Sequence, residues 1–302
     1  DANLVLGRLN AANFLGGKIP LYADRARDAV KSISDRFGES VEKTAEGILA
    51  ITVTNMANAI RTMTVNRGID PRDFVLFSYG GAGPLHASFI ARELGIGTVV
   101  VPPLPANFCA WGMLAADLKH DYNRTMIATL DDVSLDQVNK AFAEMEAAAR
   151  VTLKSEDVPD DRMIFVRTVD VRYLGQGHAL GVNVPNADLA NADRGKIAAQ
   201  FDDLHLKTYL FNAPKERKEI VSLRLSAVGQ IKSPGLPQIG AGESSPPAAA
   251  LKERRQAYYG GTWRAFDIYD RAKLLAGNTF DGPAIIEEDV STTLVLPEQN
   301  LR

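Results

Sequence analysis

The stretch Phe74-Val75-Leu76-Phe77-Ser78-Tyr79-Gly80-Gly81-Ala82-Gly83-Pro84-Leu85-His86 decides the fold class of this chain. Its first five residues are mostly apolar, which predicts a strand over 74–78 buried on both faces, as in a mixed or parallel sheet. The glycines predict a tight turn, and Pro84 suits the start of a helix that runs to Glu93. A further strand is expected over 98–101. Together these elements form an α/β unit, which binds ligands at the carboxyl ends of its strands.

Helical periodicity extends this unit in the N-terminal direction. Segment 24–37 predicts an amphipathic helix that Gly38 ends. From Ser40 to about Arg67, apolar residues recur every three or four positions, which predicts a long helix with one face on a core. After the α/β unit, residues 106–117 predict a helix.

The character of the chain then changes to α+β. Ser134 and Gln137 form a capping box before a helix, and alternation over 163–174 followed by Gly175-Gln176-Gly177 predicts a β-hairpin. The remaining segments expected to be regular are a strand over 118–128, a helix around Ile197, a strand over 221–227 and short strands over 254–296. We therefore predict two domains, 1–130 and 131–302, with a flexible Pro/Gly/Ser-rich loop at 232–250.

Composition narrows the class of protein. The chain has 302 residues, 46% hydrophobic and 24% charged, which excludes fibrous and wholly disordered classes and suits roughly two domains. Its 34 basic and 37 acidic residues give a net charge of −3, so no attraction to nucleic acid or to anionic membranes is expected. Partners should be small molecules or proteins. The sequence leaves open whether the chain forms a homo-oligomer.

Membrane insertion and disulfide bonds are not expected. The uncharged stretch 94–116 is interrupted by Pro102, Pro103 and Pro105, which favours a buried strand and helix over a membrane span. A lone cysteine, Cys109, fits a reducing compartment, so we expect a cytoplasmic protein. Because the chain starts at Asp1 without methionine, we also expect it to be a fragment.

The loop Gly80-Gly81-Ala82-Gly83 is the most informative local feature for chemistry. A glycine turn between a strand and a helix presents backbone N–H groups to an anion, and phosphate is the natural guest. No Lys-Ser/Thr pair follows, and His86 stands where a dinucleotide fingerprint has its third glycine. The alternative is that the glycines only permit close packing of helix on sheet.

Other polar residues give weaker signals. His86 lies close enough to the loop to reach a bound anion or metal, with a core histidine as the alternative. Asp117, His120 and Asp121 form an oxygen-rich group that suits Mg²⁺ or Mn²⁺, although three polar residues entering an edge strand is the favoured explanation. We expect Cys109 to be a buried inert thiol and His205 to be a packing residue.

Six strings, spread in order over the chain, carry a family resemblance. They resemble the A subunit of the hydantoinase/oxoprolinase family, which includes N-methylhydantoinase, 5-oxoprolinase and ketone carboxylase relatives. The strings are Asp1-Ala2-Asn3-Leu4-Val5-Leu6-Gly7-Arg8, Gly68-Ile69-Asp70-Pro71-Arg72-Asp73-Phe74, Gly80-Gly81-Ala82-Gly83-Pro84-Leu85-His86-Ala87, Asp117-Leu118-Lys119-His120-Asp121-Tyr122, Arg172-Tyr173-Leu174-Gly175-Gln176-Gly177-His178 and Gly282-Pro283-Ala284-Ile285-Ile286-Glu287-Glu288.

This resemblance implies an α/β fold: part of an actin-like ATPase domain of the sugar kinase and Hsp70 type, followed by a smaller, β-rich α+β domain. Family members are longer and begin with a half that carries a Gly-Gly-Thr phosphate loop, which is absent here. The chain therefore looks like the C-terminal portion of a subunit. It also stops soon after Pro297, so we expect the isolated chain to be inactive.

The implied reaction is ATP-dependent hydrolysis of a small cyclic amide, a hydantoin or 5-oxoproline, through phosphorylation of the amide oxygen. On this resemblance, Gly80, Gly81, Ala82 and Gly83 line the nucleotide. Asp1 and His86 are candidates for the catalytic and metal region, and Asp117, His120 and Asp121 are further metal candidates. ATP, Mg²⁺ or Mn²⁺ and a B subunit, separate or fused, are expected. The alternatives are a ketone carboxylase subunit and a noncatalytic scaffold for the B subunit.

Overall fold

Residues 74–100 fold into a parallel strand pair joined by a helix. In this computed structural model, which describes residues 1–232, 234–235 and 238–302, β1 (Leu76–Phe77) pairs with β2 (Val99–Val100) and α4 (Gly83–Leu94) connects them. The strand predicted over 74–78 is shorter than expected, and its burial on both faces is wrong. Phe74 and Phe77 are 57% and 42% exposed, because β1 and β2 form a sheet of two strands in the described part of the chain.

The chain divides into two compact units, and the first is discontinuous. Unit 1 consists of residues 1–113 and 235–302, and unit 2 of residues 114–234. Besides β1, β2 and α4, the helices of unit 1 are α1 (Ala2–Val5), α2 (Ala23–Phe37), α3 (Val41–Met63) and α5 (Phe108–Ala115), whose last two residues fall in unit 2. The 3-10 helices of unit 1 are η1 (Val65–Arg67), η2 (Pro71–Asp73), η3 (Pro105–Asn107), η5 (Ala248–Ala250) and η6 (Arg271–Lys273).

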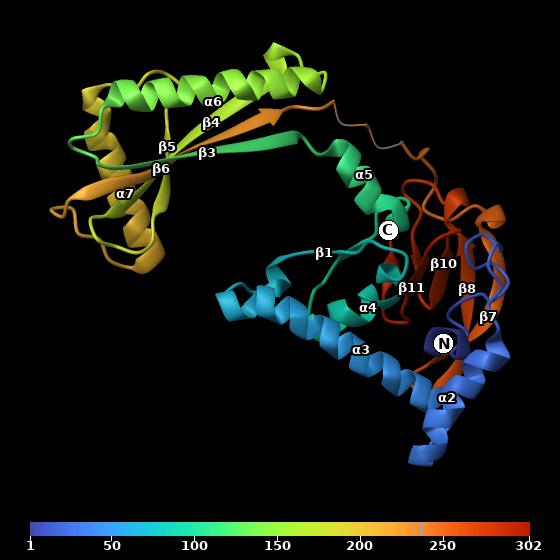
Figure 1. The fold of residues 1–302 in the computed structure, drawn as a ribbon. Helices are drawn as coiled ribbons and strands as arrows, with labels where there is room; N and C mark the ends of the chain where they lie inside the picture. Colours follow the sequence, from blue (N-terminus) through green and yellow to red (C-terminus); the bar gives the residue numbers. More distant parts are fainter. Residues whose placement is uncertain (233, 236–237) are drawn as a thin grey trace. The chain divides into compact units, whose positions relative to one another are not determined.

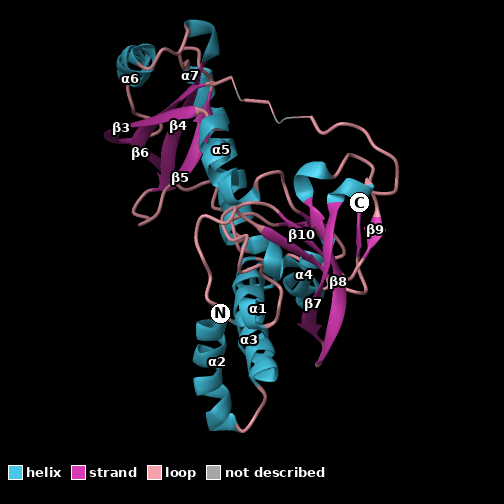
Figure 2. Ribbon diagram, turned by 90° about the vertical axis from the view of Figure 1, so that its right-hand side faces the viewer, coloured by secondary structure: helices cyan, strands magenta, loops and turns pink. Residues whose placement is uncertain are grey.

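A four-stranded mixed sheet forms the other layer of unit 1 (Figures 1 and 2). Its order is β11-β10-β8-β7, with β7 and β8 antiparallel, β8 and β10 parallel, and β10 and β11 antiparallel. The bounds are β7 (Leu251–Tyr259), β8 (Thr262–Asp270), β10 (Ala284–Glu287) and β11 (Thr292–Val295); β9 (Phe280–Asp281) and β12 (Asn300–Leu301) form a separate pair. Leu85 of α4 packs on this sheet against Phe266 and Leu294.

Unit 2 is an antiparallel sheet covered on one face by two helices (Figure 1). The sheet order is β3-β6-β4-β5, and the elements are β3 (Leu118–Thr129), α6 (Leu135–Ser155), η4 (Asp160–Arg162), β4 (Met163–Tyr173), β5 (Leu180–Val184), α7 (Asn191–Tyr209) and β6 (Lys218–Gly229). Phe142 of α6 and Phe201 of α7 are fully buried in one core with alternate residues of β4 and β6. One half of the predicted capping box is present at the start of α6, where the Ser134 side chain accepts from the Gln137 amide; the return bond from the Gln137 side chain is not recorded among the described residues.

The whole is a mixed α/β structure, as predicted. The boundaries of the compact units differ from those of the predicted domains 1–130 and 131–302, because strands after residue 250 pack with the N-terminal helices. Of the predicted flexible loop 232–250, positions 233, 236 and 237 lie outside the described residues. Residues 240–245 are hydrogen-bonded to 275–279, with the Gly242 amide donating to the Ala276 carbonyl at 2.9 Å.

Candidate functional site

The glycine loop leaves a row of backbone donors without partners. Gly80 has a φ of +87°, which favours glycine, and its amide donates to the Pro105 carbonyl at 2.7 Å. Within the described residues, no partner is recorded for the amides of Gly81, Ala82 and Gly83. These three N–H groups lie at the positive end of the twelve-residue helix α4. Such an arrangement suits an anion.

The loop opens into a cavity of about 430 Å³. Gly81 and Ala82 are exposed and line it, together with Asn13, Asn107 and the turn 288–291 between β10 and β11. We call this turn the hairpin tip. A Cβ at Gly81 would lie 3.2 Å from the Val290 carbonyl oxygen, so the tip approaches the loop closely enough to favour glycine there.

The wall opposite the loop is acidic, but most of its charge is paired. Glu287 is 4% exposed and lies 2.6 Å from Lys252 Nζ and 2.9 Å from Arg255 Nη2. Glu288 lies 3.0 Å from Arg271 Nε and accepts from the Ser291 hydroxyl at 2.7 Å.

Asp289 is the exception on this wall. No partner of its carboxylate is recorded among the described residues, and it lines the cavity with Gly81. A polyanion bound at the loop would meet this free negative charge. The donor set therefore fits a phosphate chain that arrives with a divalent cation, since Mg²⁺ is usually held by one or two carboxylates plus substrate phosphates.

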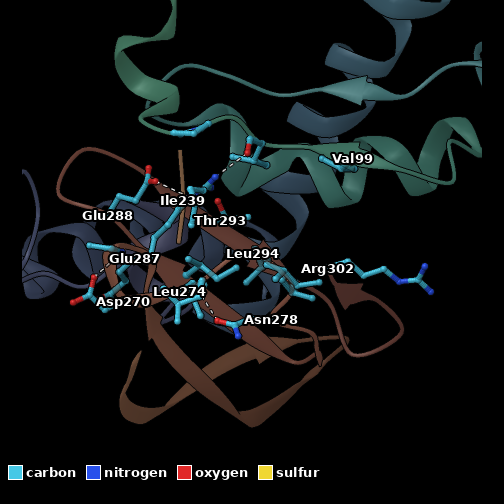
Figure 3. A pocket seen from close by; sticks show the side chains of 18 of the residues that line it. Val99, Ile239, Asp270, Leu274, Asn278, Glu287, Glu288, Thr293, Leu294 and Arg302 are labelled. Carbon is cyan, nitrogen blue, oxygen red and sulfur yellow. Dashed lines mark hydrogen bonds and ion pairs between the residues drawn. The ribbon is translucent and has the colours of Figure 1, made fainter. Parts of the chain in front are cut away.

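A larger cavity of about 1160 Å³ is also lined by residues of the hairpin tip (Figure 3). It shares Asn13 and residues 287–290 with the smaller cavity. Its walls include Val99, Leu274 and Leu294, and its polar lining includes Asn278, whose amide nitrogen donates to the Glu243 carbonyl at 2.6 Å. The two cavities therefore meet at the tip.

His86 lies on the first turns of α4 but lines neither of these cavities. Burial and the nearby Arg8 cation lower the pKa of His86, so the imidazole is neutral at pH 7. Arg8 is itself 2% exposed, and its Nη2 donates to the Tyr258 carbonyl at 3.0 Å. Burial lowers the pKa of Arg8 to about 10, against the opposing effect of Glu46.

Asp1 lies at the N-terminus of α1 and lines a third cleft, of about 340 Å³, with Asn3 and Ile48. It lines neither cavity at the hairpin tip. The structure thus places Gly81 and Ala82 at one cavity without bringing Asp1 or His86 to it. Their assignment to the phosphate or metal region stays a prediction.

Asp117, His120 and Asp121 lie in unit 2 and contact different partners. His120 Nε2 is 2.9 Å from Glu156 Oε2, whereas Asp121 accepts from the Ser226 hydroxyl, and Asp117 accepts from the Ile231 amide at 2.9 Å. Adjacent residues of a strand point to opposite faces, which separates His120 from Asp121. Among the described residues, no three His, Cys, Asp or Glu side chains gather as a metal site.

Two expectations about single residues have clear outcomes. Cys109 is exposed on α5, so the predicted burial of its thiol is wrong. His205 is fully buried, and its Nδ1 lies 2.7 Å from the Phe211 carbonyl, which confirms the packing role.

Sequence reasoning missed the hairpin tip and Arg271. The available signal was an acidic run directly after a buried apolar strand, Ile285-Ile286-Glu287-Glu288-Asp289, where a turn brings side chains to a sheet edge.

In the described part of the chain, no helix is both long and apolar enough to cross a bilayer.

Comparisons with known proteins cover nearly the whole chain. A family model described as hydantoinase/oxoprolinase matches residues 1–122, and one described as the hydantoinase/oxoprolinase C-terminal domain matches residues 130–301. An uncharacterized protein of Methanocaldococcus jannaschii is 34% identical over 99% of this chain and 42% of its own length. The caprolactamase alpha subunit of Pseudomonas jessenii is 30% identical over 98% of this chain and 43% of its own length.

Solved structures agree with these matches. A nucleotide-free structure of acetone carboxylase, from a study of ATP-dependent acetone carboxylation, superimposes with a TM-score of 0.83 at 29% identity, over 99% of this chain and 44% of that chain. The crystal structure of the ATP-dependent caprolactamase of Pseudomonas jessenii gives a TM-score of 0.74 at 29% identity, over 99% and 44% of the two chains. The chain thus spans less than half the length of these relatives.

Proposed function

The chain belongs to the hydantoinase/oxoprolinase family, and on that premise we propose that it is the C-terminal portion of an ATP-dependent cyclic amide hydrolase subunit. The observation that carries this proposal is the row of amides at Gly81, Ala82 and Gly83, which have no recorded partner among residues 1–232, 234–235 and 238–302 and lie beside the 430 Å³ cavity. The similarity to an ATP-dependent caprolactamase supports both the use of ATP and the class of substrate.

The residues of this chain bind and position the nucleotide. The three amides and the α4 dipole stabilise phosphate oxygens through charge-assisted hydrogen bonds. Asp289, a carboxylate of the cavity wall with no recorded partner in the described part of the chain, would hold Mg²⁺ or Mn²⁺ beside them, and Asp1 and His86 stay further candidates. When bound, ATP with its cation supplies the phosphoryl group that converts the amide oxygen of the substrate into a leaving group.

The context of this site is part of the same proposal. We assign unit 1 to an actin-like ATPase fold that a further part of the protein completes. A B subunit is the proposed partner, and the cytoplasm is the proposed location. Relatives named as subunits of caprolactamase and acetone carboxylase support the expectation of a partner.

The reaction is tested with the complete protein and its partner subunit. We expect ADP release that depends on a hydantoin, 5-oxoproline or a lactam, with ring opening measured in parallel. ADP release that depends on bicarbonate plus a ketone would instead favour the carboxylase alternative. The similarity to acetone carboxylase supports that alternative. Absence of nucleotide binding by titration calorimetry, with Mg²⁺ present, would favour a scaffold for the B subunit.

Gly81 tests the loop itself. We expect Gly81→Asp in the complete protein to weaken ATP binding by more than about tenfold, because the side chain crowds the Val290 carbonyl and adds a negative charge beside the phosphates. Gly47→Ala is the matched control: it lies in α3 with no neighbouring atom within 4 Å of its Cβ, and should bind ATP normally. Unchanged affinity in Gly81→Asp would remove the loop from the mechanism.

A further inference from the structure

Arg271 lies where three segments of unit 1 meet. It begins η6, directly after β8, and its side chain is 23% exposed. Its Nε lies 3.0 Å from Glu288 Oε1 in the hairpin tip, and its Nη2 donates to the Val101 carbonyl at 2.9 Å. Figure 3 shows Glu288 at the cavity wall, with a dashed line at its carboxylate. One guanidinium therefore joins η6, the tip and the end of β2.

The Val101 end of this connection leads to the glycine loop. The Ser78 amide donates to the Val100 carbonyl at 2.8 Å, and Ser78 is separated from Gly80 by a single residue. The position of β2 is thus transmitted to the loop through the β1–β2 ladder.

The Glu288 end leads to the hairpin tip. The Glu288 amide donates to the Ser291 carbonyl at 3.0 Å, and the Ser291 hydroxyl donates back to the Glu288 carboxylate at 2.7 Å. These bonds make the tip a closed turn, so a force on the Glu288 side chain moves the Val290 carbonyl as well. That carbonyl is the group that approaches Gly81.

We propose that Arg271 is a positioning residue that holds the hairpin tip against the Gly80–Gly83 loop and thereby sets the affinity of the cavity for nucleotide phosphates. This inference rests on the proposed function. Arginine suits the role because two separate nitrogens of its rigid planar fork reach Glu288 and the Val101 carbonyl, whereas lysine offers a single nitrogen on a flexible stem.

The proposal is tested in the complete protein with two measurements on the same variants. We call the contacts of Arg271 with Glu288 and the Val101 carbonyl the clamp. Hydrogen exchange tests whether the clamp restrains the loop and the tip: Arg271→Ala should accelerate amide exchange in segments 76–86 and 286–293 and leave exchange in α6 unchanged. ATP titration reports the consequence, and Arg271→Ala should raise the Kd by about tenfold or more. Arg271→Lys should fall between wild type and Arg271→Ala in both measurements.

Lys273→Ala provides the matched control. Lys273 lies on the same 3-10 turn but contacts Asp270 at 3.3 Å and is half-exposed, so neither measurement should change. Faster exchange at both segments with weaker ATP binding supports the proposal. Unchanged exchange at the two segments, or acceleration across the whole chain, overturns the clamp, and local acceleration with unchanged ATP affinity overturns its effect on binding. If wild type binds no ATP, the proposed function and the effect on binding both fail, while the exchange data still decide the clamp.

Discussion

His86 provides a pH-dependent signature at the scale of a single residue. Its pKa in the folded chain lies below the usual value of about 6.5, because burial and Arg8 disfavour the protonated imidazole. Between these two pKa values the unfolded chain binds more protons, so the free energy of unfolding decreases as the pH falls below about 6.5 and levels off below the folded pKa.

We therefore expect wild type to lose more stability than His86→Gln between about pH 7.5 and about pH 5.5 in urea unfolding. His178→Gln is the control, because His178 is exposed on the hairpin turn and should lose as much as wild type. Equal losses in all three proteins would contradict the effect assigned to His86.

Single residues also show the limit of prediction from sequence. The sequence correctly placed the glycine loop between a strand and a helix, because its conformational requirement is local. It failed for Cys109, because α5 is apolar on every side and periodicity cannot say which side faces solvent. Met113, on the same helix, is 80% exposed. The hairpin tip was missed because its approach to Gly81 joins residues far apart in the chain.

At the scale of an element, α7 depends on a buried ion pair. Asp202 is 8% exposed, accepts from the Tyr173 hydroxyl at 2.6 Å and lies 3.1 Å from Lys218 Nζ. Asp202→Asn leaves Lys218 buried without its counter-charge, so we expect a loss of about 3 kcal/mol in the free energy of unfolding. Asp203→Asn, at the exposed neighbouring position, should cost less than about 0.5 kcal/mol by chemical denaturation. Equal effects would contradict the role of the pair.

Helix ends were easier to predict than strands. Gly38 and Gly95 adopt left-handed φ values of +66° and +71° and end α2 and α4 close to the expected positions. The long helix expected to reach Arg67 ends as an α-helix at Met63 and continues as a 3-10 turn. The apolar run at 74–78 gave a strand of two residues, because strand length depends on the partner strand and not on apolar content alone.

At the scale of the whole molecule, the two units should differ in autonomy. Unit 2 is one continuous segment with its own core, whereas the core around α4 requires strands from the C-terminal part of the chain. We expect residues 118–231 alone to unfold cooperatively and to give dispersed NMR amide signals, and residues 1–113 alone to do neither. A cooperative transition in residues 1–113 would show that α4 needs no cover from the sheet.

This division could not be inferred from the sequence. Hydrophobic periodicity reports which face of an element is buried but not which distant element covers it. Leu85 and Phe266 are 181 positions apart and share one core. The composition change expected near residue 130 falls inside unit 2, which is entered at residue 114 and left at residue 234.

The insertion of unit 2 into unit 1 also sets the order of events during biosynthesis. A ribosome releases the glycine loop and α4 long before it makes β10, the hairpin tip and β11, with the whole of unit 2 emerging in between. The side of α4 that carries Leu85 therefore lacks its covering sheet while unit 2 folds, whereas Ile90 and Leu94 can already pack on α3. Because the hairpin tip is translated after unit 2, the cavity beside the glycine loop is completed only once unit 2 has been made.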